Sequence, residues 1–138
     1  MGANNYTIAE YKLGDSLVEL QRACLPSDVP ETSYPQARYW VARGDAGLVS
    51  FIIMRPFADC WYLSRAGTLP EARGQHLYPR LLRAAFTALR KAGVATVITD
   101  CAYWNTSSAN GLIRAGFKLW EPARKWGFND GLYWRKEL

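Results

Sequence analysis

The sequence has few of the residues on which disulfide frameworks, metal clusters and membrane spans depend. Its 138 residues include three cysteines, Cys24, Cys60 and Cys101, and one histidine, His76. Because the cysteines are scattered and odd in number, they form neither a CxxC metal pair nor a disulfide framework, and a reducing cytoplasm suits them best. The apolar runs fall short of the ~20 residues that cross a bilayer, and no charged-then-apolar leader opens the chain. We therefore expect a cytoplasmic protein with no metal site and no membrane partner.

What the sequence does have is enough apolar material for a folded core. Hydrophobic residues make up 49% of the chain and charged residues 21%, which excludes a disordered protein and suits a single domain over residues 1–138. The 17 lysines and arginines outnumber the 12 acidic residues, for a net charge of +5. Such an excess suits an anionic partner, but it is also common on domains that bind none.

Residue patterns predict strands interrupted by three helices. The helices are expected to end near Leu25, at Gly93 and at Gly116, and residues 44–47 predict a hairpin turn. The expected order is strand, helix, three strands, helix, strand, helix and two strands. The strands are predicted over residues 6–12, 38–43, 48–54, 59–68, 94–101, 117–120 and 131–136.

Local signals also set the helix starts and the longest loop. Ser16, with Glu19 three residues later, predicts a capping box for the first helix, and Ser107 and Ser108 are expected to cap the third. Residues 26–37 contain three prolines and cannot be regular structure. We expect this segment to be exposed and to act as a binding loop or lid.

The most informative stretch joins a predicted strand to the second helix. From Pro70 to Leu82 it reads PEARGQHLYPRLL, a basic, glycine-containing turn followed by an amphipathic helix. Uncapped N–H groups and the positive end of the peptide dipole meet at a helix N-terminus, and Arg73 adds a full charge, so a phosphate group suits this place. One apolar stripe is expected on this helix, formed by Leu77, Leu81, Leu82, Ala85, Phe86 and Leu89.

A second stretch gives the first a more specific meaning. From Asn105 to Phe117 the sequence reads NTSSANGLIRAGF. A strand ending near Pro70, a turn with Arg73 and Gly74, and this segment together resemble the GNAT N-acetyltransferase superfamily. The cofactor motif of that superfamily is Gln/Arg-x-x-Gly-x-Gly/Ala, and its next motif begins with Asn and ends in Gly-Phe twelve residues on.

The resemblance implies both a fold and an activity. The fold is a three-layer α+β arrangement, with a mixed, mostly antiparallel sheet of 6–7 strands, flanked by 3–4 helices and splayed at the acetyl-CoA site. The activity is acetyl-CoA-dependent transfer of an acetyl group to a primary amine by direct attack in a ternary complex. The acceptor is then a small-molecule or peptide amine, and a homodimer is compatible with this interpretation.

Carried over to this chain, the resemblance implies that backbone groups bind the pantetheine arm and the pyrophosphate of acetyl-CoA. The implied cofactor-binding residues are Ala66, Gly67, Thr68, Arg73, Gly74, Gln75, His76, Leu77, Tyr78, Pro79 and Asn105. His76 and Tyr78 stand where the motif has a glycine and a Gly/Ala, so the backbone there loses freedom and close approach. Pro79 removes one N–H. For Asn105 the alternative is an ordinary helix cap, and for His76 we favour a contact with phosphate or solvent over a catalytic base.

The candidate general base is Asp100, which ends an apolar strand where many members of the family carry Glu. Its alternative role is a cap or turn acid bonded to nearby amides. The general acid of the family, a Tyr seven residues after the Asn, is Leu112 here. Tyr103, Cys101 or a water could replace it, or the thiolate leaves unassisted, because a thiol pKa near ~8.5 makes it a tolerable leaving group. Tyr103 could equally be a wall of the substrate site, and a backbone N–H from residues 66–68 would stabilise the oxyanion.

Two functions of other classes stay open. A weak or silent acyl-CoA-binding or regulatory module would keep the phosphate-binding turn and tolerate Leu112. A nucleic-acid-associated domain would use the basic charge, but no motif supports it, so we do not expect a nucleic-acid partner. The acceptor is not selected by any constellation of residues, and the loop over residues 26–37 is the expected specificity element.

Overall fold

The computed structural model describes residues 5–127 and 130–138, and it confirms the expected order of elements. Three helices and seven strands are found in this part of the chain, together with a 3₁₀ turn over Pro70–Ala72. The helices are α1 (Asp15–Cys24), α2 (Leu77–Lys91) and α3 (Thr106–Arg114). The strands are β1 (Thr7–Tyr11), β2 (Arg38–Gly44), β3 (Gly47–Phe57), β4 (Cys60–Thr68), β5 (Thr96–Ala102), β6 (Lys118–Leu119) and β7 (Gly131–Glu137).

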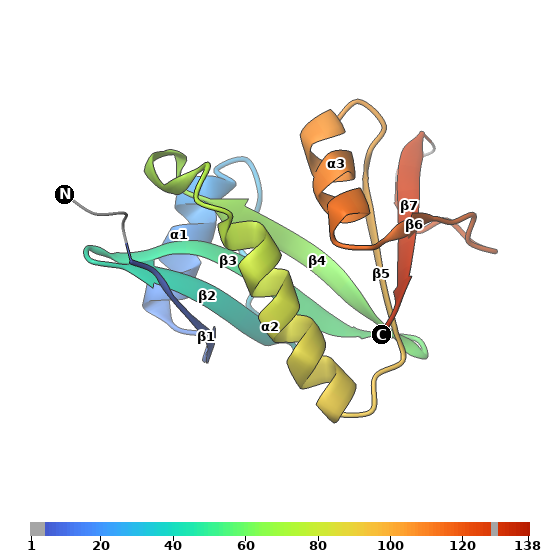
Figure 1. Ribbon diagram of the computed structural model, residues 1–138, viewed down its shortest axis with the longest axis horizontal. Coiled ribbons are helices and arrows are strands. Elements are labelled where there is room, and N and C mark those ends of the chain that lie inside the picture. Colours follow the sequence, from blue (N-terminus) through green and yellow to red (C-terminus); the bar gives the residue numbers. More distant parts are fainter. Residues whose placement is uncertain (1–4, 128–129) are drawn as a thin grey trace.

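The strands form one mixed sheet with the order β1-β2-β3-β4-β5-β7-β6. All neighbouring strands are antiparallel except β4 and β5, which run parallel and are separated in sequence by α2. β4 and β5 pair only at Trp61 with Val97 and at Tyr62 with Ile98. Beyond this point the two strands diverge, as Figure 1 shows. The predicted mixed, mostly antiparallel fold with a splayed sheet is therefore confirmed.

The two faces of the sheet carry separate cores. The whole predicted stripe of α2 is buried, and it packs with Ile52 and Met54 of β3 in one cluster. On the other face, Leu17 and Leu20 of α1 pack in a second cluster that includes Phe51 and Ile53 of β3. The residues of β3 thus alternate between the helices, because successive side chains of a strand point to opposite faces. Leu112 of α3 belongs to the same cluster as α2, so α2 and α3 share a face (Figure 1).

The predicted caps of two helices are wrong. α1 begins at Asp15 after an extended Gly14, whose carbonyl accepts the N–H groups of Leu17 and Val18, and no side chain caps it. Ser16 therefore lies inside the first turn. α3 is capped by Asn105, whose Oδ1 accepts the N–H of Ser108 at 3.1 Å.

Ser107 and Ser108 lie within α3 because the asparagine before them already supplies the short side-chain oxygen that an N-cap needs. The helix ends are as predicted. Gly93 and Gly116 both have a positive φ, of 85° and 94°, which is the left-handed conformation that terminates a helix at glycine.

The loop over residues 26–37 contains no helix or strand, as predicted, but its middle is anchored. Gln21 of α1 accepts the backbone N–H of Glu31 at 2.8 Å and donates to its carbonyl at 3.2 Å. The carboxylate of Glu31 then binds Arg65 at 2.9 Å and Ser64 at 2.9 Å, both on β4, and lies 3.7 Å from the Arg55 guanidinium on β3. The loop is therefore exposed along much of its length but fixed to the sheet at Glu31.

Gly67 of β4 packs closely against Cys24, the last residue of α1. A Cβ atom at this position would come within 2.7 Å of the Cys24 Cβ and 2.8 Å of the Phe51 ring. We predict that Gly67→Ala lowers the free energy of unfolding by about 1–3 kcal/mol, the usual cost of overpacking a core. Urea denaturation followed by circular dichroism measures this.

The matched control is Gly111→Ala in α3, where the new methyl would lie 3.5 Å from Tyr78, an ordinary contact. Because alanine is the better helix former by roughly 0.5–1 kcal/mol, this control should retain or gain stability. Equal stability of the two variants would show that α1 does not approach β4 in this way.

Candidate cofactor and active site

A cavity of about 1090 Å³ opens beside the place where β4 and β5 diverge. Its walls come from the end of α1, the end of β4, the turn before α2, one side of α2 and one side of α3. All the predicted cofactor-binding residues line it: Ala66, Gly67, Thr68, Arg73, Gly74, Gln75, His76, Leu77, Tyr78, Pro79 and Asn105. The structure thus brings together two stretches that are far apart in the sequence. The volume suits an extended ligand of the size of a nucleotide cofactor.

The cavity is strongly basic. Its described lining includes five permanent cations and no aspartate or glutamate; the cations are Arg73, Arg83, Arg90, Arg114 and Lys136. None of the five forms a salt bridge with a carboxylate in the described part of the chain. Unpaired charges of one sign around a cavity attract a ligand of the opposite sign. Only Arg73 of the five was singled out from the sequence; the other four come from α2, α3 and β7.

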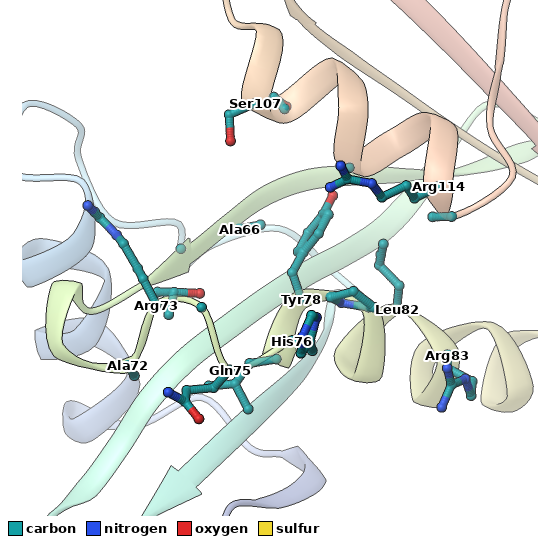
Figure 2. Close-up of a pocket in the computed structure, with 18 of the residues that line it drawn as sticks. Ala66, Ala72, Arg73, Gln75, His76, Tyr78, Leu82, Arg83, Ser107 and Arg114 are labelled. Carbon is teal, nitrogen blue, oxygen red and sulfur yellow. The ribbon is translucent and has the colours of Figure 1, made fainter. Parts of the chain in front are cut away.

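The turn before α2 keeps the shape of a phosphate-binding loop although a glycine is replaced. Gly74 has a φ of 78°, and His76 has φ 58° and ψ 33°, in the left-handed region. His76 therefore adopts the conformation for which the motif has a glycine, at a cost of about 1–2 kcal/mol for a residue with a Cβ. No side chain caps α2, so the N–H groups of Leu77 and Tyr78 are available to a ligand. Figure 2 shows Gln75, His76 and Tyr78 where the turn runs into this helix.

The end of β4 is rigid on one side and open on the other. On the β3 side, Ser50 donates to the Gly67 carbonyl at 3.0 Å and shares a 2.7 Å hydrogen bond with the Thr68 hydroxyl. On the β5 side, the hydroxyl of Thr99 donates to the Leu63 carbonyl at 2.7 Å, immediately after the last backbone pair. Beyond this bond, the backbone groups of β4 that point toward β5 face the gap. They are the groups that the sequence assigns to the pantetheine arm.

Asp100 lies on β5, on the other face of the sheet from the cavity. Its Oδ1 accepts the Tyr62 hydroxyl at 2.5 Å and the Trp126 indole N–H at 3.1 Å. The alternative role of a cap or turn acid is not what is observed, because these partners are side chains from β4 and from the segment after β6. Burial, and next the hydrogen bond to Asp100, raise the pKa of Tyr62 well above its ordinary value. The phenol therefore stays protonated and holds the carboxylate in place.

An aromatic cluster surrounds this carboxylate. The Trp126 ring lies 5.5 Å from Phe57, 5.9 Å from Tyr62 and 4.6 Å from Tyr133, measured between ring centroids. These distances are typical of edge-to-face aromatic packing. The sequence did not assign Tyr62 to the site, and only the pairing of β4 with β5 brings it to Asp100.

The other candidate residues are distributed differently. Tyr103 follows β5, is 60% exposed and does not line the cavity. Leu112, at the position of the family's Tyr, is buried in the core with α2. Cys101 is buried on the cavity side of β5, where it accepts the indole N–H of Trp134 at 3.3 Å. Catalytic roles for Asp100 and Tyr103 therefore stay predictions.

The sequence comparison decides the family. The chain matches the family model described as Acetyltransferase (GNAT) family over residues 6–117. The chain belongs to this family. The match spans both motifs and the diverging strands, so the resemblance read from the sequence is confirmed. No curated protein sequence matches the chain significantly.

Solved structures of this acetyltransferase family share the fold. The ribosomal-protein-S18-alanine N-acetyltransferase of Escherichia coli superposes with a TM-score of 0.77 at 16% identity, covering 96% of this chain and 94% of that one. The PaiA N-acetyltransferase of Thermoplasma acidophilum, in complex with coenzyme A, gives 0.73 at 16% identity, covering 96% and 99%. A GNAT family acetyltransferase of Elizabethkingia anophelis with acetyl-CoA bound gives 0.74 at 11% identity, covering 97% and 99%. At these identities the likeness shows the fold.

No helix in the described part of the chain has the length and apolar character to cross a membrane. The described residues also contain no group of three or more His, Cys, Asp or Glu side chains able to hold a metal ion.

The strained residue of the phosphate-binding turn gives a prediction. Because glycine adopts a positive φ without steric cost, His76→Gly should exceed His76→Ala in free energy of unfolding by about 1 kcal/mol. Thermal or urea unfolding of the two variants measures the difference. If the alanine and glycine variants are equally stable, His76 does not hold a left-handed conformation.

Proposed function

We propose that the protein is an acetyl-CoA-dependent N-acetyltransferase that transfers an acetyl group to a primary amine by direct attack in a ternary complex. The observation that carries this proposal is the basic cavity, which places an uncapped helix N-terminus beside the gap between β4 and β5 in a member of the GNAT family. In this proposal residues 1–138 form one acetyltransferase domain that works in the cytoplasm.

The residues present fit an acetyl-CoA molecule. Its phosphates carry several negative charges, and the cavity offers unpaired cations together with the N–H groups of residues 74–78. Arg73 lies in the turn itself and would pair with the pyrophosphate. The amides of the pantetheine arm would pair with the backbone of Ala66–Thr68, as a strand pairs with an open sheet edge. When bound, the thioester supplies the acetyl group and a thiolate leaving group.

The protein residues would then orient the reactants and handle protons. The turn at residues 73–79 holds one end of acetyl-CoA, and the diverging strands hold the other, which fixes the thioester in the gap. A backbone N–H of β4 that faces the gap would donate to the oxyanion. Asp100 lies on β5 past the last backbone pair with β4, on the opposite face from the cavity, and would accept the proton of the attacking amine, directly or through water.

The amine acceptor would approach on the face that carries Asp100. There the loop over residues 26–37 lies against β3 and β4, through Glu31 with Arg55 and Arg65. Trp126 borders the same face. The acceptor would be a small-molecule or peptide amine; the Escherichia coli structural neighbour acts, by its name, on an alanine of ribosomal protein S18.

A second function is favoured by one specific observation. Tyr78 replaces a small residue of the motif and its side chain lines the cavity, so it occupies space that a glycine or alanine would leave to a ligand. A weak or silent acyl-CoA-binding module would tolerate this.

Calorimetric titration with acetyl-CoA tests cofactor binding, which the enzyme and the silent module have in common. We predict saturable binding that Arg73→Gln weakens about tenfold, since a charge-assisted hydrogen bond contributes about 1.5–3 kcal/mol. The control is Arg22→Gln, an exposed residue of α1 outside the cavity, which should bind normally. Absence of binding at millimolar acetyl-CoA would overturn the proposal.

Release of free thiol with a panel of amines separates the enzyme from the silent module. We predict that Asp100→Asn retains acetyl-CoA affinity and lowers turnover about 10²-fold or more, the usual contribution of a general base. An asparagine oxygen still accepts the bonds from Tyr62 and Trp126, so the fold should persist. Tyr62→Phe is the matched variant: it keeps the carboxylate and should lose less turnover. Equal turnover of Asp100→Asn and the natural protein would assign Asp100 a structural role.

A further inference from the structure

Arg55 of β3 lies beside the Asp100 site, and the proposed reaction does not use it. In the pairing of β3 with β4 it stands directly opposite Tyr62, and its guanidinium carbon lies 5.0 Å from the centre of the Tyr62 ring. The hydroxyl of the same tyrosine donates to Asp100 at 2.5 Å. These three residues therefore form a row across β3, β4 and β5, with a cation at one end and a carboxylate at the other.

The positive charge of Arg55 is only partly compensated within the described part of the chain. The carboxylate of Glu31 lies 3.7 Å from its Nε, which is too long for a hydrogen bond. Glu31 instead binds Arg65 and Ser64, each at 2.9 Å. Two guanidinium groups thus share one carboxylate in this cluster, which leaves one unit of positive charge on the face that carries Asp100.

Stacking on two aromatic rings orients Arg55 without supplying a hydrogen-bond acceptor. Its carbon lies 3.8 Å from the ring centre of Tyr34, in the loop over residues 26–37, and it also lies over Tyr62. The rings attract the charge but accept none of the five in-plane N–H groups of a guanidinium. The Nε is buried and has no hydrogen-bond partner among the described residues. Since the side chain as a whole is 18% exposed, solvent reaches its other atoms.

A purely structural role explains the contacts of Arg55 poorly. The loop is already fixed to the sheet at Glu31, through bonds with Gln21, Arg65 and Ser64 that do not involve Arg55. An apolar side chain at this position would pack against the same tyrosines without the cost of withdrawing a charge from water. A ligand that meets the charge explains it better than packing does.

We propose that Arg55 binds a carboxylate of the acceptor, so that the molecule acetylated carries both a primary amine and a carboxylate. The inference rests on the proposed function and names the class of its acceptor. Arginine pairs with a carboxylate through two parallel N–H···O bonds, and one carboxylate matches the single unit of charge left in the cluster. The amine then lies toward Asp100, at the other end of the row. Tyr34, stacked on the guanidinium, gives the loop over residues 26–37 a part in specificity.

The test measures acetyl transfer to glycine, β-alanine and γ-aminobutyrate, and to the amide of each. An amide keeps the amine but lacks the carboxylate, and the different chain lengths cover different separations of the two groups. We expect Arg55→Gln to lower kcat/KM for the acids about tenfold or more, mainly through KM, and to leave the amides nearly unchanged. Because each acceptor is compared between proteins, the different basicities of the amines cancel.

Two further variants complete the design. Arg43→Gln is the matched control, because Arg43 also lies over a tyrosine ring, 5.9 Å from the centre of Tyr11, but belongs to β2; it should change neither acids nor amides. Arg55→Lys keeps the charge without the planar fork and should retain part of the activity on the acids. Arg55 does not line the cofactor cavity, so equal acetyl-CoA affinity, measured by calorimetry, shows that each variant is folded.

The outcomes separate this inference from the proposed function. If the natural protein does not bind acetyl-CoA, the proposed function fails and this inference fails with it. If the protein binds acetyl-CoA but acetylates none of the acids, only this inference is overturned. The same holds if Arg55→Gln lowers kcat/KM for acids and amides equally, because the side chain would then act on the fold of the site and not on a carboxylate.

Discussion

The divergence of β4 from β5 is the constraint on which the rest of the structure depends. The two strands share only two paired positions, ending at Tyr62 and Ile98, yet neither strand is loose. β4 stays paired with β3 up to Thr68, and β5 stays paired with β7 up to Ala102. Each strand is therefore held by its outer neighbour while its inner edge is open. Two rigid edges with unpaired backbone groups form a slot into which an extended, amide-bearing ligand fits.

The slot also explains why the two faces of the sheet differ in chemistry. α2 and α3 cover one face and surround the cavity with unpaired cations. The opposite face, beyond α1, carries Asp100 within a cluster of aromatic rings. A closed sheet would separate these two environments completely. In this protein the sheet is open between them, so in the proposed reaction an anionic acetyl donor held on one face would meet an amine presented on the other.

The sequence predicts the elements well because their signals are local. The stripe of α2 has a helical period, and every predicted member of it is buried. The relative order of the turn at Arg73 and the segment from Asn105 predicts a shared site, and the cavity contains both. The partners of Asp100 were not predictable, because Tyr62 reaches it through strand register and Trp126 through a long-range contact.

Other errors in the sequence-based prediction come from neighbouring residues that could each fill the same role. Asn105 and the serines after it are all good caps, and only the start of α3 decides between them. The conformation of His76 follows from its position in the turn, since residues other than glycine adopt a positive φ only uncommonly. Sequence patterns therefore predict the path of the backbone more reliably than the contacts between side chains.

The hydrogen bonds and ion pairs of Glu31 affect how the sequence of this protein can vary. Its backbone is fixed by Gln21, and its carboxylate binds Arg65, so the long segment between α1 and β2 is divided into two short spans with a common fixed point. Short spans lose less entropy on ordering than one long loop. Each span can also change in length or composition while the other keeps its path. Surfaces on this side of the sheet can therefore diversify in evolution one half at a time, without disturbing α1 or the slot.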